Sequence, residues 1–181
     1  MIEHGLAALA GWLVQADVGI GLLVLVGLSM SLSHLFALAA NRLSMRQIAI
    51  QLVLDGLVLS VALLLNSLVT MLMLTLVAGI PVQPSHLLNT LAAALIPGLF
   101  YAFVAAPYIS DLIALSIWFL IHLNVVTLLH AHFNLSYGAA LMLSTPGFAL
   151  TLVLVMALFH QSWQTGYRRL ASELEPLNKL P

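Results

Sequence analysis

Long apolar stretches separated by short polar connections make up most of the chain. A transmembrane helix needs about 20 mainly apolar residues to cross a hydrocarbon core of about 30 Å. The stretches that meet this requirement, and that we predict as five spans, are 18–40, 48–78, 87–106, 112–130 and 137–159. The second is too long to cross upright, so we expect it to tilt or to begin as an interfacial turn before Asp55.

The short connections force consecutive helices to lie antiparallel and side by side. The sequence therefore predicts an all-α integral membrane protein, a five-helix transmembrane bundle over residues 17–160. Before it, apolar residues recur at helical spacing from Ile2 to Leu13, which predicts an amphipathic helix over 1–16 in the outer interface. The chain opens with Glu3 and no Lys or Arg, so we expect no cleaved signal peptide. Residues 161–181 are predicted to form a polar inside tail with a turn or two of helix.

Composition supports this class of protein. Hydrophobic residues make up 62% of the chain, charged residues 6%, and the mean hydropathy is +1.12. Soluble domains carry about 25% charge, which this chain lacks. The net charge of −1 leaves no basic surface for nucleic acid. The absence of cysteine excludes disulfides and thiolate metal sites.

The basic residues predict the orientation of the bundle. They fall in two places, the first loop and the tail, as Arg42, Arg46, Arg168, Arg169 and Lys179. Four predicted spans separate the two places, so both lie on one side, and the positive-inside rule makes that side cytoplasmic or stromal. We therefore expect the N-terminus outside and the C-terminus inside, with these arginines as inside anchors.

Ionisable residues within a membrane are expensive and are the first place to look for function. Asp55 is the one acid well within a predicted span, and His34 reaches a similar depth on the preceding helix. Because both helices leave the same short loop, we predict that His34 and Asp55 are hydrogen-bonded or ion-paired. We favour a structural role, in which the pair holds this helical hairpin together. The alternatives are a proton-relay or ligand role for the pair, or an Asp55 side chain that extends to the inner interface.

Other polar residues suggest a seam through the bundle. Asn66 lies close to three helical turns beyond Asp55, and His122 and Asn124 sit near the middle of the fourth predicted span. Such side chains more often join helices by hydrogen bonds than line a pathway. We therefore predict a structural seam of Asn66, His122 and Asn124.

The seven histidines raise the question of a metal or cofactor. His86, His130 and His132 fall at the predicted outer end, and His122 at mid-membrane could hold a pigment or haem. Zinc sites usually need three or four ligands, and His130 and His132 point apart on a continuous helix. We predict interfacial histidines without a metal, no cofactor, and bound lipid.

Small residues mark a predicted packing face on the third helix. They repeat every four residues, as Ala94, Gly98, Ala102 and Ala106. Small residues at this spacing let another helix approach closely. Pro97 lies among them and predicts a kink at mid-depth, because it removes a backbone donor.

The run LLNTLAAALIPGLFYAFVAAPYISDLIALSIWFLIHLNVVTLLHAHFNLSYGAAL resembles the Ypt/Rab-interacting protein (Yip) family of five-span membrane proteins. In that family a third helix with a central proline leads to a fourth helix with a tryptophan, and here Pro97 and Trp118 occupy those places. The resemblance covers about half the chain, and the DLYGP-type motif of eukaryotic members is absent, so Rab GTPase binding is not implied. It implies a five-span layout and a non-enzymatic membrane-organising role, and it assigns no functional residue.

Three functions remain open from the sequence. The leading hypothesis is a non-catalytic assembly, scaffold or accessory factor for other membrane proteins or complexes, since phosphate-loop, HExxH and GxSxG motifs are absent. The second is a small transporter or proton-conducting protein that uses Asp55, His34 and Asn66. The third is an accessory subunit of a bioenergetic membrane complex, for example a photosynthetic one.

Overall fold

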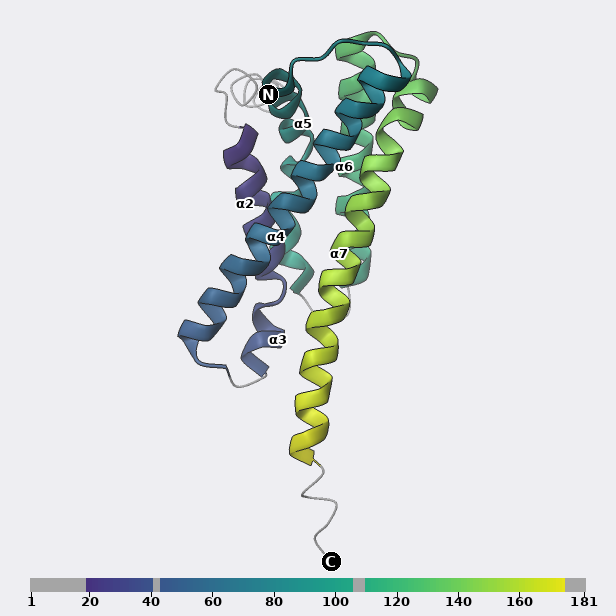
Figure 1. The fold of residues 1–181 in the computed structure, drawn as a ribbon. Helices are drawn as coiled ribbons and strands as arrows, with labels where there is room; N and C mark the ends of the chain where they lie inside the picture. The colour runs from purple at the N-terminus through teal and green to yellow at the C-terminus, as the bar shows by residue number, and fades with distance from the viewer. Residues whose placement is uncertain (1–18, 41–42, 106–109, 175–181) are drawn as a thin grey trace, which may run out of the picture.

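The computed structural model describes residues 19–40, 43–105 and 110–174, and these residues form an all-helical bundle (Figure 1). The amphipathic helix predicted over 1–16 lies outside the described residues, as do Arg42, Ala106 and Lys179.

The first predicted span is divided in two. Helix α2 runs from Gly19 to Leu32 and helix α3 from Leu35 to Ala40, with a turn at Ser33 and His34. The span predicted over 18–40 is therefore a broken helix rather than a continuous one. The amides of Ser33 and His34 bond to carbonyls three residues back, at 3.2 and 3.0 Å, in place of the α-helical partners four residues back.

Helix α4, Met45–Leu72, is the longest apolar element and begins with a capping box. The Gln47 amide donates to Ser44 Oγ, and the Gln47 side chain accepts from the Ser44 amide. The helix continues as a π-helical segment, η1 (Met73–Val77), and the chain then turns through Gly79 at φ 68°. The backbone is helical throughout the ten residues before Asp55.

The third predicted span is a bent pair of helices. Helix α5 covers Pro84–Ala94 and a 3-10 helix, η2, covers Ile96–Ala105, with a bend of 44° between them. The predicted kink is therefore present and lies directly before Pro97, which supplies no amide hydrogen to the helix. Helices α6 (Ser110–Phe133) and α7 (Tyr137–Leu174) complete the bundle, and α7 extends well beyond the predicted limit of residue 159 (Figure 1). Helices α4, α6 and α7 and the pairs α2–α3 and α5–η2 run alternately in opposite directions along the bundle.

Among the described residues, three helical segments are long and apolar enough to cross a membrane: Met45–Val77, Leu112–Phe133 and Tyr137–Leu158. The bent pair α5–η2 makes a fourth if it counts as one span, whereas α2 has only 14 residues. Large apolar side chains on the outer faces of α4, α6 and α7 are exposed, among them Leu57, Leu115 and Met142. Exposed apolar surface of this extent is typical of contact with lipid.

The core forms two apolar clusters. One gathers α2, the middle of α4, η2 and the first half of α6, with Val26, Leu59 and Ile121 fully buried. The other gathers α5, the second half of α6 and the start of α7, with Leu129 and Ala140 fully buried. Helix α2, with only 14 residues, packs against α4 and against both parts of the bent pair.

Candidate functional site

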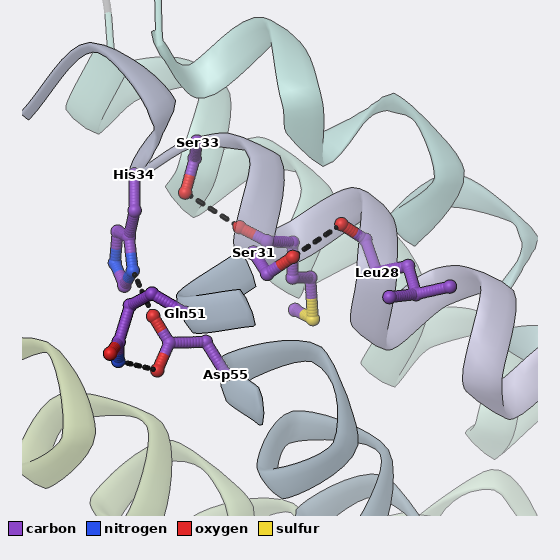
Figure 2. Close-up of polar contacts among 7 residues, drawn as sticks. Leu28, Ser31, Ser33, His34, Gln51 and Asp55 are labelled. Carbon is purple, nitrogen blue, oxygen red and sulfur yellow. Dashed lines mark hydrogen bonds and ion pairs between the residues drawn. The ribbon is translucent and has the colours of Figure 1, made fainter. Parts of the chain in front are cut away.

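His34, in the turn between α2 and α3, and Asp55 of α4 meet within the first helical hairpin. Asp55 Oδ2 lies 3.3 Å from His34 Nδ1, and Asp55 Oδ1 accepts a hydrogen bond of 2.8 Å from Gln51 Nε2 (Figure 2). His34 is 8% exposed and Asp55 4%. The contact predicted from the hairpin is therefore present, and Gln51, four residues before Asp55 on the same helix face, is a partner that the sequence reading missed.

The break in the first span presents His34 to Asp55. Ser31 Oγ donates to the Leu28 carbonyl at 2.8 Å, and Ser33 Oγ donates to the Met30 carbonyl at 2.7 Å (Figure 2). Serine hydroxyls compete with the backbone ladder in this way and often bend helices. The turn that they support ends α2, and His34 projects from it toward α4.

This arrangement is suited to holding two helices together. Both carboxylate oxygens of Asp55 already have partners, one on α4 itself and one on the α2–α3 turn. A carboxylate can be buried as long as both of these partners remain, because their hydrogen bonds offset the cost of removing it from water. Removal of either partner would leave a polar group unpaired in a low-dielectric site.

The structure does not join the predicted seam into one network. Asn124 Nδ2 donates to the Ala94 carbonyl of α5 at 3.3 Å. In a continuous α-helix that carbonyl would accept from the Gly98 amide, which instead donates to Leu95 O at 2.7 Å. Asn124 therefore satisfies a carbonyl that the bend before Pro97 leaves free.

Asn66 and His122 lie elsewhere and have unsatisfied atoms. His122 stacks on Phe148 of α7, with ring centroids 4.2 Å apart, and its buried Nδ1 has no hydrogen-bond partner among the described residues. Asn66 Oδ1 and Thr70 Oγ1 are likewise buried and unpaired there. Both face Gly147, where an added Cβ would lie 2.7 Å from Asn66 Oδ1 and 3.1 Å from Thr70 Oγ1.

The predicted packing face on the third helix is wrong in its period. From Ile96 the chain is a 3-10 helix, in which residues three apart share a face. Leu95, Gly98 and Tyr101 are buried at this spacing, whereas Ala102 is only partly buried. Of the predicted set, Ala94 and Gly98 are buried, and a Cβ on Gly98 would lie 2.6 Å from Val26 Cγ1.

A closer helix contact lies between α2 and α4. A Cβ on Gly27 would lie 2.2 Å from Ser60 Oγ and 2.5 Å from the Gly56 carbonyl. Gly56 and Ser60 are four residues apart, which is the small-residue spacing that lets helices approach closely in membranes. The sequence reading missed this pair, although Gly56-x-x-x-Ser60 is its visible signal.

Several polar side chains form hydrogen bonds between separate helices. Ser29 Oγ donates to the Leu99 carbonyl at 2.7 Å, and Thr151 Oγ1 donates to the Ala62 carbonyl at 3.1 Å. The Gly19 amide, at the start of α2, donates to Asn89 Oδ1 at 2.8 Å. These bonds link α2 to the bent pair and α7 to α4, so polar residues within the bundle join helices in several places.

The histidines at the start of α5 and the end of α6 form two separate contacts. His130 stacks on Tyr137 at 3.9 Å between centroids, and its Nδ1 meets the Leu135 carbonyl. His132 lies beside His86, with centroids 5.0 Å apart. Helix α6 runs through both positions to Phe133, so His130 and His132 do not converge. Within the described residues no group of three or more His, Cys, Asp or Glu side chains could hold a metal ion.

The apolar helices and their exposed outer faces define a helical membrane protein. Comparison of the chain with protein-family models, curated proteins and solved structures finds no match. The resemblance to the Yip family therefore stays a prediction.

Proposed function

We propose that this chain is a five-span, non-catalytic membrane protein that acts as an assembly, scaffold or accessory factor for other membrane proteins. The proposal places the N-terminus outside and the C-terminus inside, with α2 and α3 together as the first span and α5 and η2 as the third. Each is then a broken helix whose two parts cover the length that one span needs.

The observation that carries the proposal is the use made of polar groups inside the bundle. The carboxylate of Asp55 is held from two sides, and Asn124, Ser29 and Thr151 are each bound to a carbonyl of another helix. A pathway for ions or protons needs polar groups that are open to exchange along its length. Asp55, Asn124, Ser29 and Thr151 are committed to helix packing, which supports a structural bundle, whereas Asn66 and His122 keep buried atoms without a partner among the described residues.

The arrangement along α4 also favours this function over transport. Asp55 and Asn66 are separated by eleven residues, or about 16 Å at a helical rise of about 1.5 Å per residue. The fully buried Leu59 and Leu63 lie between them on the same helix. The transport hypothesis needs a polar connection across this apolar interval.

Co-purification tests the proposal most directly. The protein is extracted from its native membrane in a mild detergent, and the membrane proteins that accompany it are identified and compared with those that accompany an unrelated multi-span protein of similar abundance. We expect a defined partner in fixed ratio to this chain. The purified preparation should also be colourless, whereas a bound pigment or haem would favour the bioenergetic-subunit alternative.

Reconstitution into liposomes tests the transport alternative. We expect no proton flux above that of empty liposomes. The scaffold proposal fails if the wild-type chain carries protons and Asp55→Asn abolishes the flux while the variant remains folded and monodisperse in detergent.

A further inference from the structure

Two histidines that are distant in the sequence meet at the outer end of the bundle. His86 lies in the first turn of α5 and His132 in the last turn of α6. Their ring centroids are 5.0 Å apart, and the ring planes are inclined by 44°. Both side chains are exposed, so a solute can reach them from the aqueous phase.

From this geometry we propose that His86 and His132 form a site for a zinc-class divalent cation. Imidazole nitrogen is a ligand that suits Zn²⁺, Cu²⁺ and Ni²⁺. With Zn–N bonds of about 2.1 Å and tetrahedral angles, two imidazoles on one ion have centroids about 5 Å apart. The observed separation of 5.0 Å therefore matches that of two rings sharing one ion.

The end of α6 adds an electrostatic contribution. The C-terminus of a helix carries partial negative charge from its last carbonyls, which favours a cation beside the last turn. His132 occupies that turn. The opposite sign at the start of α5, beside His86, offsets part of this effect, so the imidazole nitrogens themselves supply most of the binding.

The number of ligands sets the character of the site. Since no third His, Cys, Asp or Glu of the described residues joins the pair, water completes the coordination. Sites with open positions exchange their ions and ligands, whereas structural zinc sites have four protein ligands. The bound ion would link the outer ends of α5 and α6 reversibly, and this inference does not depend on the proposed function.

His130 provides a matched control. It lies two residues before His132 at the end of the same helix, but its ring stacks on Tyr137 and its Nδ1 meets the Leu135 carbonyl. It is therefore engaged with the start of α7 rather than with His86. A variant at this position removes one histidine from the same region and leaves the pair intact.

Calorimetric titration with Zn²⁺ tests the site. The full chain is purified in detergent without a polyhistidine tag, freed of metal with a chelator, and dialysed; because it has no cysteine, no thiolate competes. We expect a binding phase of one Zn²⁺ per chain, weakened about tenfold or more in His86→Ala and in His132→Ala and unchanged in His130→Ala. Acidification to about pH 5 should release the ion, because protons compete for imidazole nitrogens.

Chemical modification of the wild-type chain provides a second measurement that needs no variant. Diethyl pyrocarbonate modifies free imidazoles, and mass spectrometry reports the extent at each histidine. We expect Zn²⁺ to protect His86 and His132 and to leave the modification of His130 unchanged. The proposal is overturned if the wild-type chain shows no such binding phase, if the double variant His86→Ala/His132→Ala binds as tightly as the wild type, or if Zn²⁺ protects neither histidine.

Discussion

At the scale of single residues, Asp55 shows how a charged group is accommodated inside an apolar bundle. One oxygen is bound by Gln51 on its own helix and the other lies beside His34 from the neighbouring segment. The pairing of helices at this end thus depends on three side chains, two of which are separated from the third by the loop. The loop length made the His34–Asp55 contact predictable, whereas the role of Gln51 depends on its rotamer.

Substitution of Asp55 should separate the loss of charge from the loss of hydrogen bonds. Asp55→Ala removes the acceptor of the Gln51 amide and the contact with His34, so we expect a loss of about 1–3 kcal/mol in the free energy of unfolding. Asp55→Asn keeps an acceptor and the side-chain volume, so its cost should be clearly smaller. Unfolding by SDS in mixed micelles measures both; equal costs for the two variants would contradict this account.

Gly27 should be intolerant of even one added methyl group. A Cβ there would lie 2.5 Å from the Gly56 carbonyl and 2.9 Å from the Ser60 amide, and backbone atoms cannot rotate away. We expect Gly27→Ala to lower the free energy of unfolding by about 1–3 kcal/mol.

The matched control for this substitution is Gly21→Ala on the same helix. Gly21 is exposed, and a Cβ at that position would meet nothing within 4 Å. Alanine should therefore be neutral or slightly stabilising there, because it restricts the unfolded chain. Similar losses at both positions would show that α2 does not pack on α4 through Gly27.

At the scale of elements, the bent pair α5–η2 explains why polar residues cluster where they do. A ten-residue 3-10 helix is unusually long, and where it follows α5 the Gly98 amide bonds to Leu95 instead of Ala94, so the Ala94 carbonyl loses its α-helical partner. Ser29 from α2 and Asn124 from α6 donate to two carbonyls of this bent pair. Its exposed side shows the same period, because Phe100 and Phe103, three residues apart, stack on each other.

A double-mutant cycle should reveal the coupling between Pro97 and Asn124. Asn124→Leu leaves the Ala94 carbonyl without its donor, so we expect it to cost about 1 kcal/mol. In a Pro97→Ala background the helix can restore α-helical bonding, and Gly98 can donate to Ala94. The cost of Asn124→Leu should then fall, which gives a measurable interaction energy between the two sites. Strict additivity of the two substitutions would contradict the coupling.

At the scale of the whole molecule, the sequence predicted the helical class, the bend beside Pro97 and the His34–Asp55 contact. Hydropathy and loop length determine these features directly. It did not predict the break at Ser33 or the 3-10 period after Ile96, because hydropathy does not determine whether a backbone amide bonds three or four residues back, or whether a serine hydroxyl bonds to the backbone. His86 and His132 lie at the ends of two different helices, so no local sequence pattern predicts their contact.

The orientation of the chain in the membrane is the remaining prediction at this scale. The charge pattern predicts that the loop before α4 is inside and the loop before α5 outside.

Labelling of single introduced cysteines tests this orientation, because the chain has no cysteine of its own that would also react. Met45, at the start of α4, is 82% exposed, and Gln83, before α5, is exposed and makes no capping hydrogen bond. We expect Gln83→Cys to react with a membrane-impermeant maleimide in intact cells or organelles, and Met45→Cys to react only after permeabilisation. The reverse labelling would show that the orientation is opposite to the predicted one. Labelling of both positions from one side would show that α4 does not cross the membrane.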